Sequence, residues 1–115
     1  MLRSDIWLVD LDPARSGEAS KQRPAVLVSN DGANTTAARL GRGTVTVVPL
    51  TSNLTKVYPF QVRVPADRSG LDDDSKAQAE QVRSVSVARL LRRIGSVPAD
   101  LMQELDEALR LHLAL

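Results

Sequence analysis

Residues 44–50, TVTVVPL, have the composition of a strand buried at the centre of a sheet, because β-branched and apolar residues fill the run. Thr51 follows directly and therefore stands at the end of this strand. Two other runs, residues 5–11 (DIWLVDL) and residues 25–29 (AVLVS), are rich in the same residue types. Three such runs in the first half of a short chain favour a mostly β fold.

The second half of the chain predicts shorter strands and one terminal helix. Residues 58–64 alternate apolar and polar side chains as a half-exposed strand does, and we expect further strands over 77–85 and 92–97, with a helical turn near 87–90. From about Pro98, leucine and alanine recur at three- and four-residue spacings, which predicts a C-terminal helix.

Polar segments separate these elements. We expect loops at residues 14–22 and 66–75, and a loop with a short helical turn over residues 30–43. Pro24 favours extended backbone angles at the preceding Arg23, which places that arginine where the first loop leads into a strand. Five or so short strands and one helix predict an α+β fold of mostly β structure, an SH3-like, partly open barrel with a C-terminal helix. The 115 residues suit one domain, residues 1–115.

Composition excludes several classes of function. The chain has no cysteine and one histidine, His112, so sulfur-ligated zinc, thiolate catalysis and a histidine pair within one chain are impossible. Hydrophobic residues make up 43% and charged residues 25%, and no run approaches the length of a transmembrane helix. We therefore expect a cytoplasmic protein with no membrane association. The net charge is only +1, although residues 81–99 contain four arginines and no acid, namely Arg83, Arg89, Arg92 and Arg93.

Five ordered blocks of sequence cover nearly the whole chain and resemble one known family. The blocks are residues 5–13 (DIWLVDLDP), residues 17–29 from Gly17-Glu18 through QRPAVLVS, residues 48–52 (VPLTS), Lys56 with residues 58–60 (YPF), and residues 79–84 (AEQVRS). In this order and spacing they resemble the MazF/PemK toxins of bacterial type II toxin-antitoxin systems. Ser4 departs from the pattern, because many relatives carry a glycine there, and residues 30–43 follow no family pattern.

The resemblance implies a homodimeric, metal-independent endoribonuclease that cuts single-stranded RNA at a short motif and is blocked by a MazE-like antitoxin. It assigns the catalytic roles to Arg23 and Thr51. It also suggests five RNA-binding residues, with Gln81 preferred to its neighbour Glu80 by family position: Glu18, Ser52, Asn53, Lys56 and Gln81.

The chemistry of RNA cleavage suits these residue types. RNA carries its own nucleophile, the 2′-hydroxyl group, so neither a metal nor any other cofactor is obligatory. The guanidinium of Arg23 can donate two hydrogen bonds to a phosphate, and the hydroxyl of Thr51 can donate another. Because a guanidinium has a pKa above about 12, we favour an electrostatic role for Arg23 over proton transfer. The aromatic residues offer little for base stacking, since Trp7 and Phe60 are expected in the core.

Two other functions compete with the nuclease. A CcdB-type poison of DNA gyrase would share the architecture without chemistry, but that group lacks the arginine and threonine pair and ends in Trp-Gly-Ile, whereas this chain ends in residues 113–115, LAL. A noncatalytic RNA-binding or antitoxin-binding module would keep the fold and tolerate the loss of Arg23. A cleavage assay on an Arg23→Ala variant separates the last possibility from the enzyme.

Overall fold

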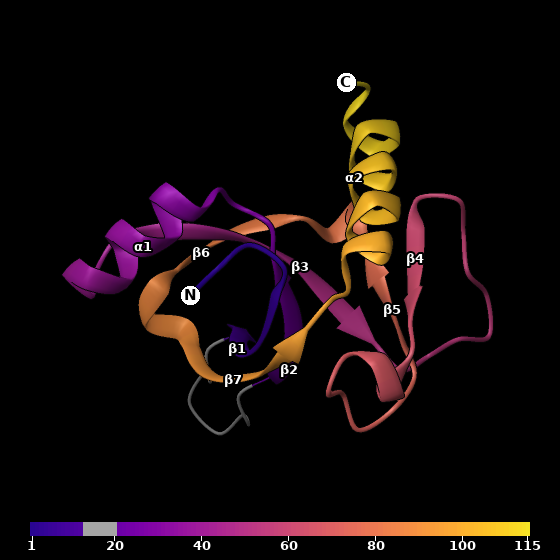
Figure 1. The fold of residues 1–115 in the computed structure, drawn as a ribbon, viewed down its shortest axis with the longest axis horizontal. Helices are drawn as coiled ribbons and strands as arrows, with labels where there is room; N and C mark the ends of the chain where they lie inside the picture. The colour runs from indigo at the N-terminus through magenta and orange to yellow at the C-terminus, as the bar shows by residue number, and fades with distance from the viewer. Residues whose placement is uncertain (13–20) are drawn as a thin grey trace.

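The computed structural model describes residues 1–12 and 21–115, and in this part of the chain seven strands and two α-helices form the fold (Figure 1). The strands are β1 (Asp5–Asp12), β2 (Lys21–Leu27), β3 (Thr44–Thr51), β4 (Gln61–Val64), β5 (Ser75–Gln78), β6 (Arg83–Ser86) and β7 (Leu90–Ser96). The helices are α1 (Asp31–Leu40) and α2 (Ala99–Leu113), with single 3₁₀ turns η1 (Ala66–Arg68), η2 (Ala79–Gln81) and η3 (Val87–Arg89).

The strands make one antiparallel sheet in the order β4-β5-β3-β2-β1-β7, and β6 also pairs with β3. β3 is the central element: its beginning pairs with β6, its middle with β2 and its end with β5. The edge strands β4 and β7 do not pair with each other, so the sheet is not closed. The expected mostly β fold, an open barrel-like sheet with a C-terminal helix, is confirmed, with more strands than the five predicted.

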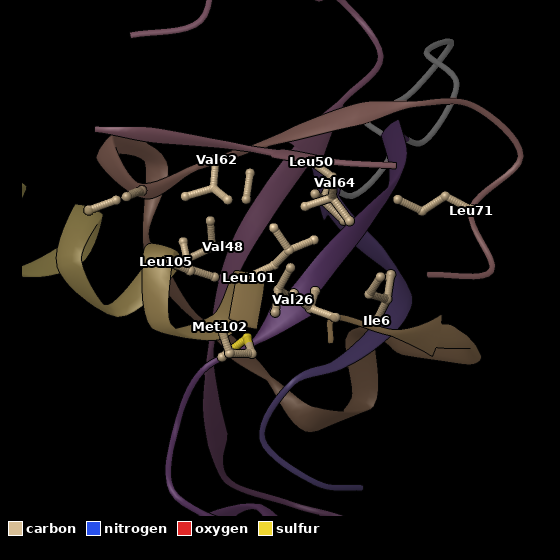
Figure 2. Packing of buried hydrophobic residues seen from close by; sticks show 14 residues of the cluster. Ile6, Val26, Val48, Leu50, Val62, Val64, Leu71, Leu101, Met102 and Leu105 are labelled. Atoms are coloured by element: carbon tan, nitrogen blue, oxygen red, sulfur yellow. The ribbon is translucent and has the colours of Figure 1, made fainter. Parts of the chain in front are cut away.

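Alternating side chains of β1, β2 and β3 enter two separate cores. Val26, Val48 and Leu50 join residues of β4, β5 and α2 in the first core, and Figure 2 shows these side chains pointing toward one another. Their neighbours Leu27 and Val47 point the other way into the second core. Because both faces of these strands are buried, their sequences are nearly continuous apolar runs rather than half-polar ones.

Helix α1 corrects the sequence-based expectation of a loop with a short turn. The side chain of Asn30 accepts a hydrogen bond from the N–H of Ala33 (2.8 Å), and Gly41 ends the helix with a left-handed φ of 67°. Asparagine before a helix and glycine after it are strong boundary signals. The sequence pattern did not predict this helix because only Asn34 and Ala37 are buried, so apolar residues show almost no helical periodicity.

Three other boundaries also differ from the expectation. The strand expected over residues 58–64 begins only at Gln61, because the preceding residues form a turn. The strand expected over 77–85 is divided in two by η2. The expected surface loop 66–75 buries Ser69 and Leu71 and contains η1.

Ser4 has an unusual backbone conformation near the start of β1. Ser4, where the family resemblance implies a glycine, has a φ of 85°, a conformation that costs an L-residue about 1–2 kcal/mol. Its N–H nevertheless donates to the carbonyl of Leu27 (2.8 Å), which ties the N-terminus to β2.

Within the described part of the chain, neither helix has the length and apolar character needed to cross a bilayer.

Candidate functional site

A pocket opens where β2 and β3 separate. The ladder between these strands has the pairs Leu27–Val47, Val26–Val48 and Ala25–Pro49, and the same register continued by two residues places Arg23 opposite Thr51. The β2–β3 ladder ends at the Ala25–Pro49 pair, where neither Pro24 nor Pro49 has an N–H to donate across the strands. The end of β3 pairs instead with β5, through Thr51 and Lys76.

The pocket has a volume of about 300 Å³ and contains both predicted catalytic residues. Arg23 and Thr51 line it together with Ser52, and Arg92 of β7 contributes a second guanidinium. The remaining lining residues are Pro24, Leu50, Gly70, Leu71, Asp72, Asp73, Ser75 and Ile94. Residues far apart in sequence thus bring two cations, three hydroxyl-bearing side chains and two carboxylates around one cavity.

The structure refines the position of Arg23. The sequence predicted this arginine where a loop leads into a strand, but it lies inside β2, where it pairs with Val9 of β1. Its side chain is exposed, and no carboxylate among residues 1–11 and 22–115 lies within ion-pair distance of it. The backbone is therefore held by the sheet while the guanidinium remains available to an anion.

One wall of the pocket is formed by residues 70–73, and the residue before them, Ser69, packs against Gly95 of β7. A Cβ atom built on Gly95 would lie 1.8 Å from the carbonyl oxygen of Ser69, so the close approach of these segments requires a glycine. The same carbonyl accepts a hydrogen bond from the N–H of Ser96 (3.0 Å). The position of the next residues, 70–73, therefore depends on this contact.

Two ion pairs fix the ends of this wall. Arg68 of η1 donates two hydrogen bonds to Asp100 in the first turn of α2, and this contact lowers the pKa of Asp100 and raises that of Arg68. The N–H of Ala66 and the guanidinium of Arg63 both donate to Asp74, and these bonds lower the pKa of its carboxyl. Asp74 is thus engaged in structure, whereas its neighbours Asp72 and Asp73 line the pocket.

The predicted RNA-binding residues fall into four groups, the last of which is Gln81 on η2. Ser52 lines the pocket, and Glu18 lies outside the described residues. Asn53 and Lys56 are exposed in the segment that joins β3 to β4, which we call the 52–60 loop; it runs beside β4 in Figure 1. Within it the N–H of Asn53 donates to the hydroxyl of Thr51 (3.3 Å), and Asn53 Oδ1 accepts from the N–H of Thr55 (3.1 Å).

Gln81 lies on η2 and not on the strand that the sequence predicted over residues 77–85. Its side chain is exposed and is not part of the pocket lining. Glu80 accepts a hydrogen bond from Gln61 (2.7 Å), whose amide oxygen accepts from the N–H of Tyr58 (3.1 Å). The turn that carries Gln81 is therefore linked to the 52–60 loop through two hydrogen bonds.

Three pocket residues were missed by the sequence analysis. Arg92 was noted only as one member of a basic run, and Asp72 and Asp73 only as part of an expected loop.

The expected core position of Phe60 is wrong. Its ring stacks on Tyr58 with the centroids 5.2 Å apart, and it belongs to neither core. Trp7, by contrast, packs against the second core.

The arrangement suits an anionic, phosphate-like group. Guanidinium groups and a hydroxyl can bind phosphate oxygens, and a carboxylate can accept a proton from a nearby hydroxyl group. His112 lies exposed on the last turn of α2 and is not part of this lining. Within the described ranges, no three His, Cys, Asp or Glu side chains gather as a metal site would require.

Comparison with known proteins gives this pocket its context. The profile of the PemK-like, MazF-like toxins of type II toxin-antitoxin systems matches residues 2–113. The chain is 64% identical over 115 residues to Endoribonuclease MazF9 of Mycobacterium tuberculosis, covering 100% of this chain and 98% of that protein.

Solved structures agree on the fold. Mycobacterium tuberculosis toxin MazF-mt6 superposes with a TM-score of 0.77 at 25% identity, over 96% of this chain and 97% of that one. A chain of the MazE-MazF crystal structure (Form-II) from Deinococcus radiodurans gives a TM-score of 0.80 at 25% identity, over 100% and 96%. These relatives give no support to a CcdB-type gyrase poison. The chain belongs to the PemK-like, MazF-like family of toxins of type II toxin-antitoxin systems.

Proposed function

We propose that this toxin is a metal-independent endoribonuclease that cleaves single-stranded RNA at a specific sequence, with Arg23 and Thr51 as its catalytic residues. The observation that carries the proposal is that these two residues, 28 positions apart, line one pocket across the opening between β2 and β3. The similarity to an endoribonuclease along the whole chain supports the same activity.

In the proposed reaction the 2′-oxygen of a ribose attacks the adjacent phosphorus, and the bond from phosphorus to the 5′-oxygen breaks. The products are a 2′,3′-cyclic phosphate and a 5′-hydroxyl. Arg23 and Arg92 stabilise the negative charge that develops on the phosphoryl oxygens, and Thr51 donates a hydrogen bond to one of them. A carboxylate of Asp72 or Asp73 can accept the proton of the 2′-hydroxyl. A water molecule gives a proton to the leaving 5′-oxygen and takes one from the carboxyl group, which regenerates the carboxylate.

The partners proposed for this chain are RNA, a second copy and an antitoxin. The support for a MazE-like antitoxin is the solved MazE-MazF complex of a relative. Support for a homodimer comes from three exposed leucines, because a group of uncovered apolar side chains favours association. Leu111 and Leu113 lie in the last turn of α2, and Leu115 follows it. Ser52, Asn53, Lys56 and Gln81 are proposed to contact RNA, as is Glu18.

The experiment that tests the activity uses purified protein, a long single-stranded RNA and excess EDTA. We expect cleavage to continue under these conditions and the mapped ends to reveal both the cut motif and the cyclic phosphate. Arg23→Ala should lower kcat about 100-fold or more, and Thr51→Ala about tenfold, because each removes a donor to the transition state.

Arg39→Ala provides a matched control, since it removes an exposed arginine from the last turn of α1 and should leave cleavage unchanged. All variants are first checked for folding by circular dichroism. Failure of the parent protein to cut several long RNAs would point to a binding-only function. Full activity in Arg23→Ala would exclude the proposed mechanism.

A further inference from the structure

Lys76 is a buried lysine beside the candidate catalytic threonine. It pairs across the sheet with Thr51, and only 7% of its surface is exposed. Leu50 and Ala77, the neighbours of this pair, point into the first core, so Thr51 and Lys76 point to the opposite face of the sheet. Lysine is almost never buried unless it is paired, because removing an ammonium group from water is costly.

The contacts of this ammonium group lead to the 52–60 loop. Lys76 Nζ donates a hydrogen bond to the carbonyl oxygen of Lys56 (2.5 Å) and lies 5.9 Å from the centre of the Tyr58 ring. No carboxylate within the described part of the chain lies within ion-pair distance of it. The side chain is therefore held between the sheet and the loop, and none of the described carboxylates neutralises it.

The exposed side of the loop carries groups that suit a nucleic acid. Lys56 Nζ lies 5.3 Å from the centre of the Tyr58 ring, which stacks on Phe60 with an angle of 3° between the ring planes. Tyr58 remains 41% exposed. A lysine binds phosphate, and the exposed part of a tyrosine can contact RNA through its hydroxyl group or ring edge. Both of these groups depend for their position on the backbone that Lys76 fastens.

We propose that Lys76 is a positioning residue for RNA binding: its ammonium group fastens the 52–60 loop, so that Lys56 and Tyr58 are held beside Thr51. This inference rests on the proposed ribonuclease function. The alternative, that Lys76 only stabilises the fold, is physically weak. Replacing a buried charge by an apolar side chain of similar size is often neutral or stabilising, so stability alone gives no reason for a lysine here.

The test compares the parent with Lys76→Met, which keeps the length of the side chain and removes the donor and the charge. We expect the free energy of unfolding to be unchanged or higher, and trypsin to cut the native protein after Lys56 at least about fivefold faster. For a single-stranded RNA substrate, KM should rise about fivefold or more while kcat changes less than about threefold. Lys76→Arg keeps a cationic donor and should restore part of the lost affinity.

Two controls separate positioning from a general effect of charge. Arg110→Met removes one positive charge from the exposed face of α2 and should leave both KM and proteolysis unchanged. In a Lys56→Met/Tyr58→Ala background, Lys76→Met should change KM less than about twofold, because the residues that it positions are gone.

An unchanged KM and an unchanged rate of cleavage after Lys56 would overturn the inference, as would a full effect of Lys76→Met in the double-variant background. Parent protein that cuts no RNA would refute the proposed nuclease instead. In that case, trypsin digestion and the binding of a fluorescein-labelled single-stranded RNA still decide the role of Lys76: equal digestion rates and equal affinities of parent and Lys76→Met would overturn it.

Discussion

Arg92 and Arg23 reach one pocket from β7 and β2, which lie on either side of β1. No carboxylate of the described chain lies within ion-pair distance of either guanidinium. Their guanidinium groups therefore remain free to bind an anion in a cavity of about 300 Å³, although Asp72 and Asp73 also line it and the whole chain is nearly neutral. The second arginine should therefore matter to the same reaction as the first.

Arg92→Ala is expected to lower kcat/KM about tenfold, because a charge-assisted hydrogen bond to a phosphate is lost at an exposed site. Arg93→Ala is the matched control: the adjacent residue on β7 pairs with Asp5 (3.3 Å) and does not line the pocket. Its activity should stay within about twofold of the parent. Equal losses in the two variants would mean that general surface charge, and not the pocket, determines activity.

The sequence could identify Arg23 and Thr51 but not Arg92, and the reason is geometric. Arg23 and Thr51 lie in blocks that resemble a family, and each belongs to a regular strand. Which arginine of the basic run faces the pocket depends on the register of β7 against β1, which shifts on both sides of the Trp7–Arg93 and Leu8–Arg92 pairs. Such bulges redirect side chains and leave no clear pattern in sequence.

At the level of elements, the pocket wall depends on the contact between β7 and residues 69–71. Ser69 lies so close to Gly95 that no side chain fits between them, and Gly70 has a φ of 87°, a conformation that suits glycine. The wall is thus positioned by backbone contact, and its aspartates follow directly in the chain.

Gly95→Ala should lower the free energy of unfolding by about 1–3 kcal/mol, because the new methyl group meets the rigid carbonyl of Ser69. Urea denaturation followed by circular dichroism measures this change. Gly32→Ala tests the same substitution in α1, where the nearest atom is the side-chain oxygen of Asn30 at 3.3 Å; it should be neutral within about 1 kcal/mol. A Gly95→Ala protein as stable as the parent would show that the wall can move at little cost.

The elements that sequence analysis missed share a physical cause. The strands β1 to β3 were predicted because both of their faces are buried, which fills them with apolar residues. Helix α1 buries little, and its signals were the capping residues Asn30 and Gly41 alone. Where η2 divides residues 77–85, Glu80 accepts a hydrogen bond from Gln61 of β4, a contact between residues far apart in the chain that local sequence patterns do not reveal.

For the whole molecule, the net charge of +1 limits how electrostatics can contribute to RNA binding. A strongly basic protein attracts nucleic acid over its whole surface, whereas here attraction must come from a few local contacts. Arg23, Arg92 and Lys56 are the cations proposed to meet phosphates. Each contact with single-stranded RNA contributes about 0.7 to the slope of log affinity against log salt concentration.

We therefore expect the affinity for a noncleavable single-stranded RNA, carrying a 2′-deoxyribose at the cut site, to fall with salt at a slope of about −2, because three contacts contribute. Fluorescence anisotropy between about 50 and 300 mM KCl measures it. Arg92→Ala should make the slope shallower by about 0.7, while Arg93→Ala should leave it unchanged. A slope near zero would mean that hydrogen bonds to bases dominate recognition. A slope steeper than about −5 would require many more phosphate contacts than the three proposed for one chain. That result is expected if a second copy contributes its own cations to the same RNA.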